Sequence, residues 1–267
     1  MQKETVLDHL WIFTCAANSD YLHIGRRSVM SPVEGAFYLG VPNIIVVQSS
    51  ATEATYGRLD PPFAQYTVAM LPLKRVVWSI VGSGGFYSEA EAREVIDIAH
   101  QTPNLAGIML DDFFTGQENG ERAQLTVSKL ADIRRQLLSS ARKLDIFVTL
   151  YTSHLELPLE DYWNLIDVVT LWTGSPLELV NLEANLDRVG NLLPSKRKML
   201  GCYMVDYHEK RSIPISLMQH QCEIGLRWLR QGRIDGIIFL GNTIMDLGFE
   251  AVEWTRGWIQ EVGSEEI

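Results

Sequence analysis

The chain has 267 residues, of which 46% are hydrophobic and 21% are charged, and this composition suits one large globular domain with a sizeable core. Its formal net charge of −10 disfavours nucleic acids and anionic membrane surfaces as partners, because those surfaces are bound by clustered Lys and Arg. Its three cysteines lack the spacing of a metal site and disfavour both a disulfide framework and a zinc site.

The N-terminal residues, Met1 to Glu4, lack the basic and then apolar run of a signal peptide. No uncharged apolar stretch is long enough to cross a bilayer. We therefore expect no membrane partner and a cytoplasmic location, or export if a signal peptide precedes this sequence.

Short apolar runs bounded by turn residues recur along the chain, with helical periodicity between them. Several runs are rich in Val, Ile and Leu rather than alternating, as in a parallel sheet covered on both faces. In chain order they predict strands at Leu10–Cys15, Asn43–Gln48, Arg75–Val81, Gly107–Leu110, Asp145–Tyr151, Val168–Trp172, Met199–Val205 and Gly236–Leu240.

Capping patterns predict where four of the intervening helices begin. Ser31 and Ser175 are each followed by Pro at the first helical position and by Glu three residues on. Ser88 and Ser216 each have a Glu or Gln partner three residues on. We expect each helix to begin within a few residues of these serines.

The longest helix is expected at Leu125–Arg142. Its apolar face is predicted to consist of Leu130, Ile133, Leu137 and Leu138. Regular alternation of strand and helix indicates a parallel α/β architecture. Eight similar units, without a Gly-rich dinucleotide turn after the first strand, favour a single (β/α)8 TIM barrel over residues 1–267 rather than a doubly wound open sheet.

Two adjacent carboxylates follow the fourth predicted strand. In such barrels the active site forms from the loops after the C-terminal ends of the strands, which is where Asp111 and Asp112 lie. Desolvated like charges raise each other's pKa and suit general-acid chemistry. Either could be the acid; if it is Asp112, Asp111 would position it or stabilise charge. One of the two could instead cap a helix or stay solvated.

A further carboxylate, Asp206, follows the seventh predicted strand. Cleavage of a glycosidic bond needs two carboxyl groups, one to protonate the leaving oxygen and one to act as nucleophile or to activate water. Asp111 or Asp112 with Asp206 could supply them. Alternatively, Asp206 or Glu209 could pair with the neighbouring Lys210 or Arg211 at the surface.

Other polar and aromatic side chains after the strands are candidate substrate contacts. Aromatic rings would stack on the apolar faces of sugar rings, although each could also be rim packing. The candidates are Gln48, Tyr151, His154, Trp172, Tyr203, His208, Glu209 and Asn242. His23 and Glu53 are further polar residues of the first two loops, and the Gly82–Gly85 loop could offer backbone N–H groups to a phosphate.

This layout resembles glycoside-hydrolase (β/α)8 barrels, in which the acid/base commonly follows strand four and the nucleophile often follows strand seven. The resemblance is carried by Leu110–Phe114 and Tyr203–Tyr207. It implies a glycosidase that acts on carbohydrate without a metal or other cofactor. No single family is indicated, because the Asp-x-x-Asp-x-Asp-x-Glu run of chitinase-like enzymes is absent and Asp111-Asp112 replaces the Asn-Glu of many cellulase-like enzymes.

Two other functions remain open at this stage. One is a sugar isomerase, epimerase or lyase whose divalent metal polarises a carbonyl. Its ligands would come from Asp111, Asp112, His154, Asp206, His208 and Glu209. The other is a barrel that binds carbohydrate without catalysis.

Overall fold

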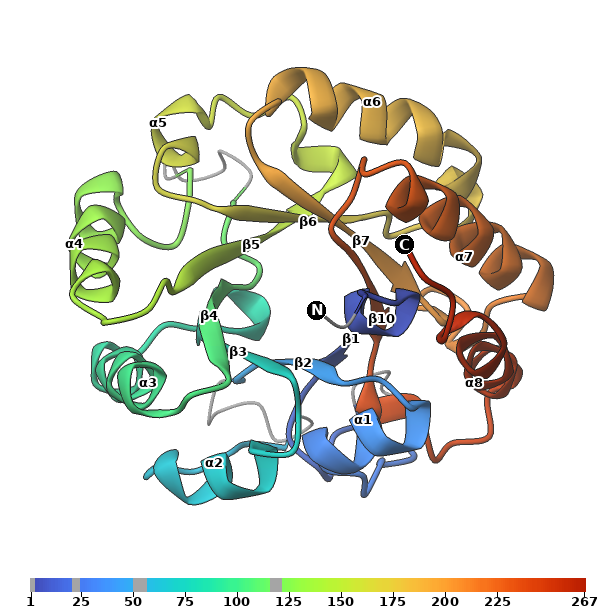
Figure 1. Cartoon of the computed structure of the whole chain (residues 1–267), viewed down its shortest axis with the longest axis horizontal. Coiled ribbons are helices and arrows are strands. Elements are labelled where there is room, and N and C mark those ends of the chain that lie inside the picture. Colours follow the sequence, from blue (N-terminus) through green and yellow to red (C-terminus); the bar gives the residue numbers. More distant parts are fainter. Residues whose placement is uncertain (1–2, 21–24, 50–56, 116–121) are drawn as a thin grey trace.

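The computed structural model describes residues 3–20, 25–49, 57–115 and 122–267. Eight parallel strands close into a barrel in the order β1-β10-β7-β6-β5-β4-β3-β2, which confirms the TIM barrel and excludes the open sheet (Figure 1). The strands are β1 (Leu10–Thr14), β2 (Asn43–Val46), β3 (Arg75–Val81), β4 (Leu105–Leu110), β5 (Asp145–Tyr151), β6 (Val168–Trp172), β7 (Arg197–Tyr203) and β10 (Gly236–Leu240).

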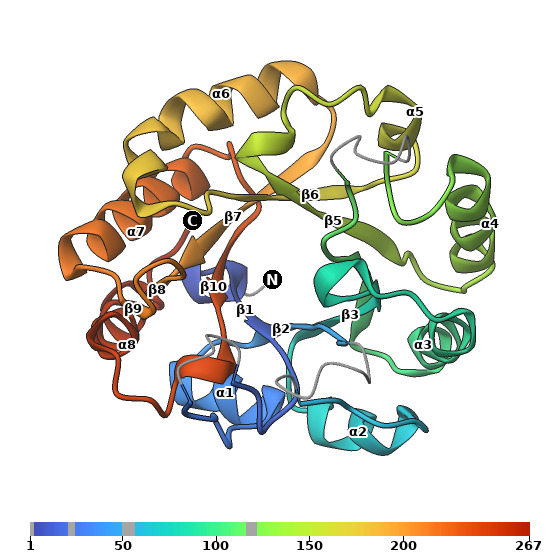
Figure 2. The same ribbon diagram turned by 180° about the vertical axis from the view of Figure 1, so that it is seen from behind.

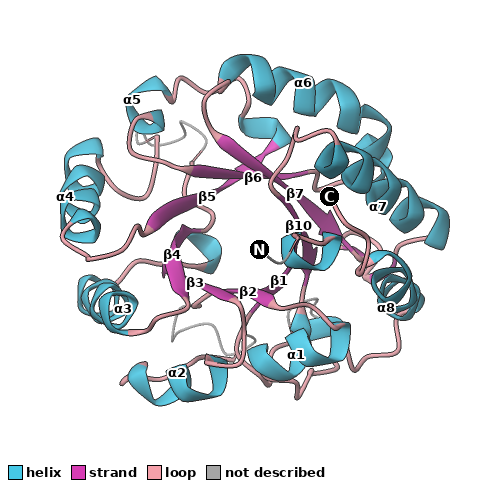
Figure 3. Ribbon diagram, in the orientation of Figure 1, coloured by secondary structure: helices cyan, strands magenta, loops and turns pink. Residues whose placement is uncertain are grey.

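Helices surround this barrel on its outer side (Figure 3). They cover the apolar outer face of the strands, so that nearly every strand residue is buried. They are α1 (Pro32–Leu39), α2 (Ala64–Met70), α3 (Glu89–Gln101), α4 (Val127–Leu138), α5 (Glu160–Trp163), α6 (Leu182–Leu192), α7 (Ile215–Arg230) and α8 (Glu250–Val262). None of the helices in the described residues is long and apolar enough to cross a membrane.

All four predicted helix starts lie within a few residues of the observed ones, and three of the four serines are caps. Ser31 caps α1 in a complete capping box, and Ser88 caps α3 through the backbone N–H of Glu91. Ser175 caps a 3-10 helix, Pro176–Asn181, which leads into α6. The start predicted at Ser216 is confirmed to within one residue, since α7 begins at Ile215, but Ser216 is not its cap because the helix follows directly on Pro214.

The prediction for α4 is corrected in length and in one residue of its apolar face. Thr126 caps this helix and it ends at Leu138, where the Ser139 hydroxyl donates to the Gln136 carbonyl and competes with the helical pattern. Among the described helices the longest is α7, with 16 residues. Leu138 is 69% exposed, because each step along a helix turns it by about 100° away from the face of Leu137.

The seventh strand ends earlier than predicted, at Tyr203. The next residues form a separate strand, β8 (Val205–Asp206), which pairs antiparallel with β9 (Arg211–Ser212). Figure 2 shows this short hairpin beside α8, and the Ser212 hydroxyl accepts from the backbone of Ala251 at the start of that helix. The turn that carries His208 and Glu209 therefore belongs to the hairpin and not to a simple barrel loop.

The two ends of the described chain pair with each other. Val6 N donates to Glu265 O at 2.9 Å, and Leu7 N donates to Gly263 O at 3.0 Å. A β-bridge also joins Thr5 to Glu266. Since residues 6–9 lead directly into β1, both ends lie at the N-terminal end of the barrel, opposite the strand ends from which a TIM-barrel site is built.

Candidate active site

A cavity of about 230 Å³, part of it open to solvent, lies at the C-terminal ends of the barrel strands. Six strands or strand ends contribute to it, so that it sits on the barrel axis. It is lined by Phe13, Asp111, Thr149, Tyr151, Trp172, Tyr203 and Leu240. Four of the predicted site residues, Asp111, Tyr151, Trp172 and Tyr203, therefore lie together.

Asp111 is the carboxylate in the wall of this cavity. Its side chain is buried, and its Oδ1 accepts a hydrogen bond from the Thr149 hydroxyl at 2.9 Å. Burial raises the pKa of Asp111 well above its usual value, and the charge of Asp112 raises it further, against smaller opposing effects of Thr149 and of the Asp112 backbone. Asp111 is therefore suited to hold a proton.

Asp112 is fixed by hydrogen bonds on both of its carboxylate oxygens. Oδ1 accepts from the Tyr151 hydroxyl at 2.5 Å, and Oδ2 accepts from the backbone N–H of Gly84 at 2.8 Å. Its φ of 43° lies in the left-handed region, which Asp tolerates better than most residues. The side chain of Asp112 is therefore held in place by two neutral donors.

The two acids thus stand in different environments. Asp111 is buried with one side-chain hydroxyl donor, whereas Asp112 is partly exposed with two donors. A buried carboxyl group with a raised pKa is the usual arrangement of a general acid. Of the two acids, between which the sequence does not decide, Asp111 is the one that lines the cavity.

Trp172 forms the aromatic wall of the cavity. Its ring packs against Phe13 at 5.4 Å and Tyr203 at 5.0 Å between centroids, and its Nε1 donates to the Thr170 hydroxyl. The indole lies against the backbone of Gly201, where an added Cβ would be only 2.1 Å from a ring atom. Glycine at position 201 therefore provides the space that the indole occupies.

Tyr151 and Tyr203 place two phenols next to the carboxylates. Their hydroxyls interact with each other, and that of Tyr151 also donates to Asp112. Burial raises the pKa of both phenols, and the charges of Asp111 and Asp112 raise it further. Both phenols are therefore neutral donors in the resting site.

His154 lies beside this group, in a short 3-10 helix after β5. Its ring meets that of Tyr151 edge-on, with centroids 5.3 Å apart. Burial lowers the pKa of His154, although the charge of Asp112 acts in the opposite direction. Its buried Nδ1 has no hydrogen-bond partner among the described residues, so His154 packs as a neutral ring near Asp112.

Asp206, His208 and Glu209 lie in the β8–β9 hairpin. Asp206 Oδ1 accepts from the backbone N–H groups of His208 at 2.9 Å and Glu209 at 3.2 Å, which closes the turn. His208 and Glu209 are exposed, and Glu209 approaches Arg211 at 4.0 Å. None of the three is among the residues that line the cavity, and the contacts described for Asp206 belong to the turn.

Asn242 and Gln48 are buried and bond to backbone groups. The Asn242 amide accepts from Cys15 N and donates to the carbonyls of Cys15 and Met30, so that it ties β1 to the segment after β10. Gln48 Nε2 donates to the carbonyl of Leu59, and its Oε1 has no hydrogen-bond partner in the part of the chain that the structure describes. These contacts fix loop backbones at the rim of the barrel.

Within the described ranges, no three or more His, Cys, Asp or Glu side chains are grouped so that they could hold a metal ion. The six residues considered for a metal are divided between the strand-four site and the β8–β9 hairpin. The donor set of the isomerase or lyase hypothesis is thus not assembled in the part of the chain that the structure describes.

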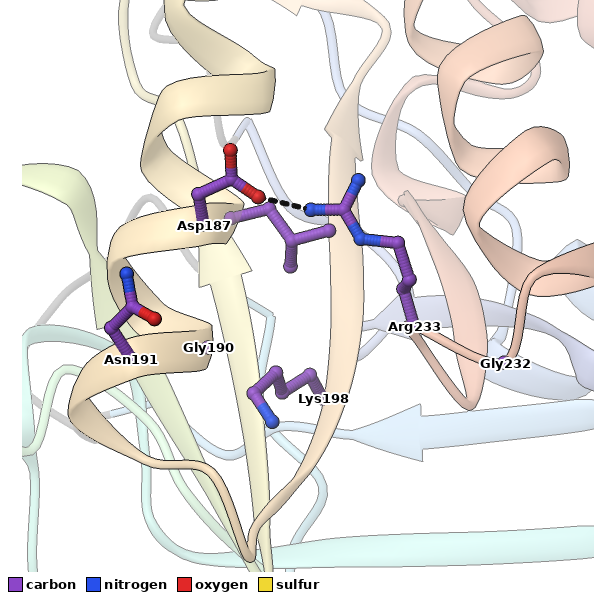
Figure 4. A pocket seen from close by; sticks show the side chains of 7 residues that line it. Asp187, Gly190, Asn191, Lys198, Gly232 and Arg233 are labelled. Atoms are coloured by element: carbon purple, nitrogen blue, oxygen red, sulfur yellow. Dashed lines mark hydrogen bonds and ion pairs between the residues drawn. The ribbon is translucent and has the colours of Figure 1, made fainter.

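A more spacious groove lies on the outside of the barrel (Figure 4). It is formed by α6, the start of β7 and the turn after α7, where Arg233 is paired with Asp187 and Lys198 points inward. Burial lowers the pKa of Lys198. Because this groove borders the N-terminal end of β7, it is remote from the strand ends that build a TIM-barrel site.

The sequence did not single out three residues that line the cavity: Phe13, Thr149 and Leu240. Thr149 carried a usable signal, since it is a polar residue in an apolar strand, spaced by two from Tyr151 and so on the same inward face. The Gly82–Gly85 loop does offer an N–H group, but to Asp112. His23 and Glu53 lie outside the described residues.

No protein-family model matches the chain, and no curated protein matches its sequence. Its fold is similar to that of the xylanase and amylase inhibitor protein XAIP-III, with a TM-score of 0.59, 11% identity, and coverage of 93% of this chain and 98% of the other. For a GH113 β-1,4-mannanase the TM-score is 0.58, with 12% identity and coverage of 95% and 99%.

A chitinase domain from Pyrococcus furiosus gives a TM-score of 0.56, with 15% identity and coverage of 89% and 84%. Most of the similar structures are glycoside hydrolases. At these identities the likeness establishes the fold alone, because one barrel fold hosts many activities.

Proposed function

We propose that this barrel is a glycoside hydrolase whose general acid is Asp111. The observation that carries the proposal is a buried carboxyl group with a raised pKa in the wall of an aromatic cavity, next to a second carboxyl group that accepts hydrogen bonds on both of its oxygens. An acid with a raised pKa is what protonation of a leaving glycosidic oxygen requires near neutral pH.

The shape of the cavity supports a sugar as the ligand. Trp172, Tyr203 and Phe13 provide apolar ring surface, on which the C–H face of a pyranose can stack. The proposed substrate is therefore a glycoside whose terminal ring enters the barrel mouth. The prevalence of glycoside hydrolases among similar folds is consistent with this proposal.

The test is turnover of a panel of nitrophenyl glycosides that covers gluco-, galacto-, manno-, fuco- and N-acetylglucosamine configurations in both anomers. Replacing Asp111 with Asn removes the transferable proton while keeping the size of the side chain. Turnover of the best substrate should fall by about 10²–10⁴-fold, the usual contribution of general acid–base catalysis.

The control is Asp187→Asn, the same change at an exposed carboxylate of the outer groove. It should leave turnover unchanged. Saturable sugar binding without turnover by the wild type would instead indicate a carbohydrate-binding barrel. Equal activity of Asp111→Asn and the wild type would show that Asp111 is not the acid.

A further inference from the structure

A glycosidase acid needs a partner that attacks the anomeric carbon or activates water. Asp111 is the only carboxylate among the described residues that line the cavity. Asp206, the partner expected from the sequence, uses its Oδ1 to close the hairpin turn. The attacking group should therefore be sought among the other side chains of the cavity.

Tyr151 has the position and the hydrogen bond that such a group needs. It lines the same cavity as Asp111, and its hydroxyl donates to Asp112 Oδ1 at 2.5 Å. A weakly acidic O–H becomes a nucleophile when an adjacent base within hydrogen-bond reach accepts its proton. Glycosidases with a tyrosine nucleophile exist, so the chemistry is accessible to this side chain.

We propose that Tyr151 is the nucleophile of the reaction and that Asp112 is the base that activates it. This inference rests on the proposed glycosidase function and adds the group that completes it. It predicts a covalent glycosyl-tyrosine intermediate and products that retain the configuration of the substrate.

The first step forms a bond between Tyr151 Oη and the anomeric carbon as the bond from that carbon to the leaving oxygen breaks. The leaving oxygen takes the proton of Asp111, and Asp112 takes the phenolic proton. In the second step water attacks the anomeric carbon and Tyr151 leaves. Asp111 takes the proton of the water, and Asp112 returns its proton to Tyr151, so that the enzyme is restored.

The electrostatics of the cavity favour a neutral nucleophile. A third carboxylate beside Asp111 and Asp112 would add like-charge repulsion at short range, whereas a phenol adds no charge. Burial and the two acids disfavour a free phenolate at Tyr151, so the proton moves to Asp112 only as the new C–O bond forms. Gly84 N–H holds the other oxygen of Asp112 and fixes this base against the phenol.

The experiment uses the panel substrate that the wild type hydrolyses fastest. Tyr151→Phe should lower its turnover by at least about 10³-fold, because the nucleophile is removed. The matched control is Tyr162→Phe, which removes a buried phenolic hydrogen bond to the Leu125 carbonyl outside the cavity. It should retain wild-type turnover.

Two measurements separate a nucleophile from a residue that only positions Asp112. Incubation of the wild type with the 2-deoxy-2-fluoro glycosyl fluoride of the same sugar should add one fluoroglycosyl mass, mapped by peptide sequencing to Tyr151. NMR of the first product should show retention. Tyr151→Phe should acquire no label.

Inversion, a label on Asp206 or any other residue, or wild-type turnover by Tyr151→Phe would each overturn this inference while the proposed function stands. The proposed function fails separately if the wild type hydrolyses no glycoside of the panel, and the inference then falls with it.

Discussion

Aspartates at the two ends of the barrel have different kinds of partner. At the N-terminal end, Asp145 lies 2.6 Å from Arg197 and 3.0 Å from Lys143, and Asp167 forms a two-point ion pair with Arg134. Burial alone would raise the pKa of Asp167, but the hydrogen bonds and charge of Arg134, with the Ile146 N–H, hold it below its usual value.

At the mouth, neither Asp111 nor Asp112 has an ion pair with any of the described residues. Their donors are a threonine hydroxyl, a tyrosine hydroxyl and a backbone N–H, all of them neutral. Burial then governs the outcome, and the pKa of Asp111 rises. The comparison shows that the partner decides whether a buried acid stabilises the fold or is available to give up a proton.

The largest expected effect on stability is at the N-terminal end. Arg134→Leu leaves Asp167 buried without its cation and should lower the free energy of unfolding by about 2–3 kcal/mol at pH 7. The contribution of the pair is present above the ordinary aspartate pKa and is lost as pH falls through the lowered pKa of Asp167, so the difference should shrink in acid.

Urea unfolding at several pH values measures this difference. Arg135→Leu, which breaks an exposed pair with Asp132 on the same helix, should change stability by less than about 0.5 kcal/mol. If the two variants lose equal stability, the N-terminal pairs do not differ from surface pairs and the comparison fails.

At the C-terminal end of the barrel, packing rather than ion pairing fixes the position of Trp172. Gly201→Ala places a methyl group against the Trp172 ring and should cost about 1–3 kcal/mol, with a shift in tryptophan fluorescence and reduced turnover. Gly190→Ala is the matched control, because this helical glycine has open space around it. That change should stabilise the protein by about 0.5–1 kcal/mol. Equal effects of the two would contradict the tight contact.

A third prediction concerns the pH dependence of stability. The pKa of Asp111 in the folded protein is raised above its value in the unfolded chain, so its favourable contribution is complete below the unfolded value and is lost as pH rises through the folded value. Asp111→Asn lacks this loss, and its stability relative to the wild type should therefore increase with pH. Parallel stability curves of the two proteins would refute a raised pKa.

The smallest effect is expected at Asp206. Asn keeps the Oδ1 acceptor that closes the hairpin turn, so Asp206→Asn should change stability by less than about 0.5 kcal/mol and turnover by less than about threefold. Thermal unfolding and the glycoside assay check both values. A large loss of turnover with intact folding would return Asp206 to the reaction.

The barrel could be predicted from the sequence because strands that are buried on both faces need continuous runs of apolar residues. Such runs are local patterns, which can be recognised in one segment at a time. The bounds of β3, β5, β6 and β10 agree with the prediction. The end of β7 does not agree with the prediction. The pairing of β8 with β9 sets it, and this contact between two segments cannot be predicted from a local pattern.

For the candidate site, the sequence located the paired acids but not the groups that donate hydrogen bonds to them. These donors are Thr149, Tyr151 and Gly84, which reach the acids from β5 and from the loop after β3. The position of the acids after a strand could be predicted from one segment of the sequence. Their hydrogen bonds could not, because these join three segments that are separate in the sequence.

The pairing of the two chain ends has a practical consequence. Because Val6 and Leu7 bond to Glu265 and Gly263 at the N-terminal end of the barrel, a linker attached at residue 267 emerges on the side away from the cavity. Immobilisation on a sensor surface through that end should leave the mouth facing the solution. The same closeness would let a short peptide join the two ends while the chain is opened elsewhere, so that a circularly permuted barrel can be built around an unchanged cavity.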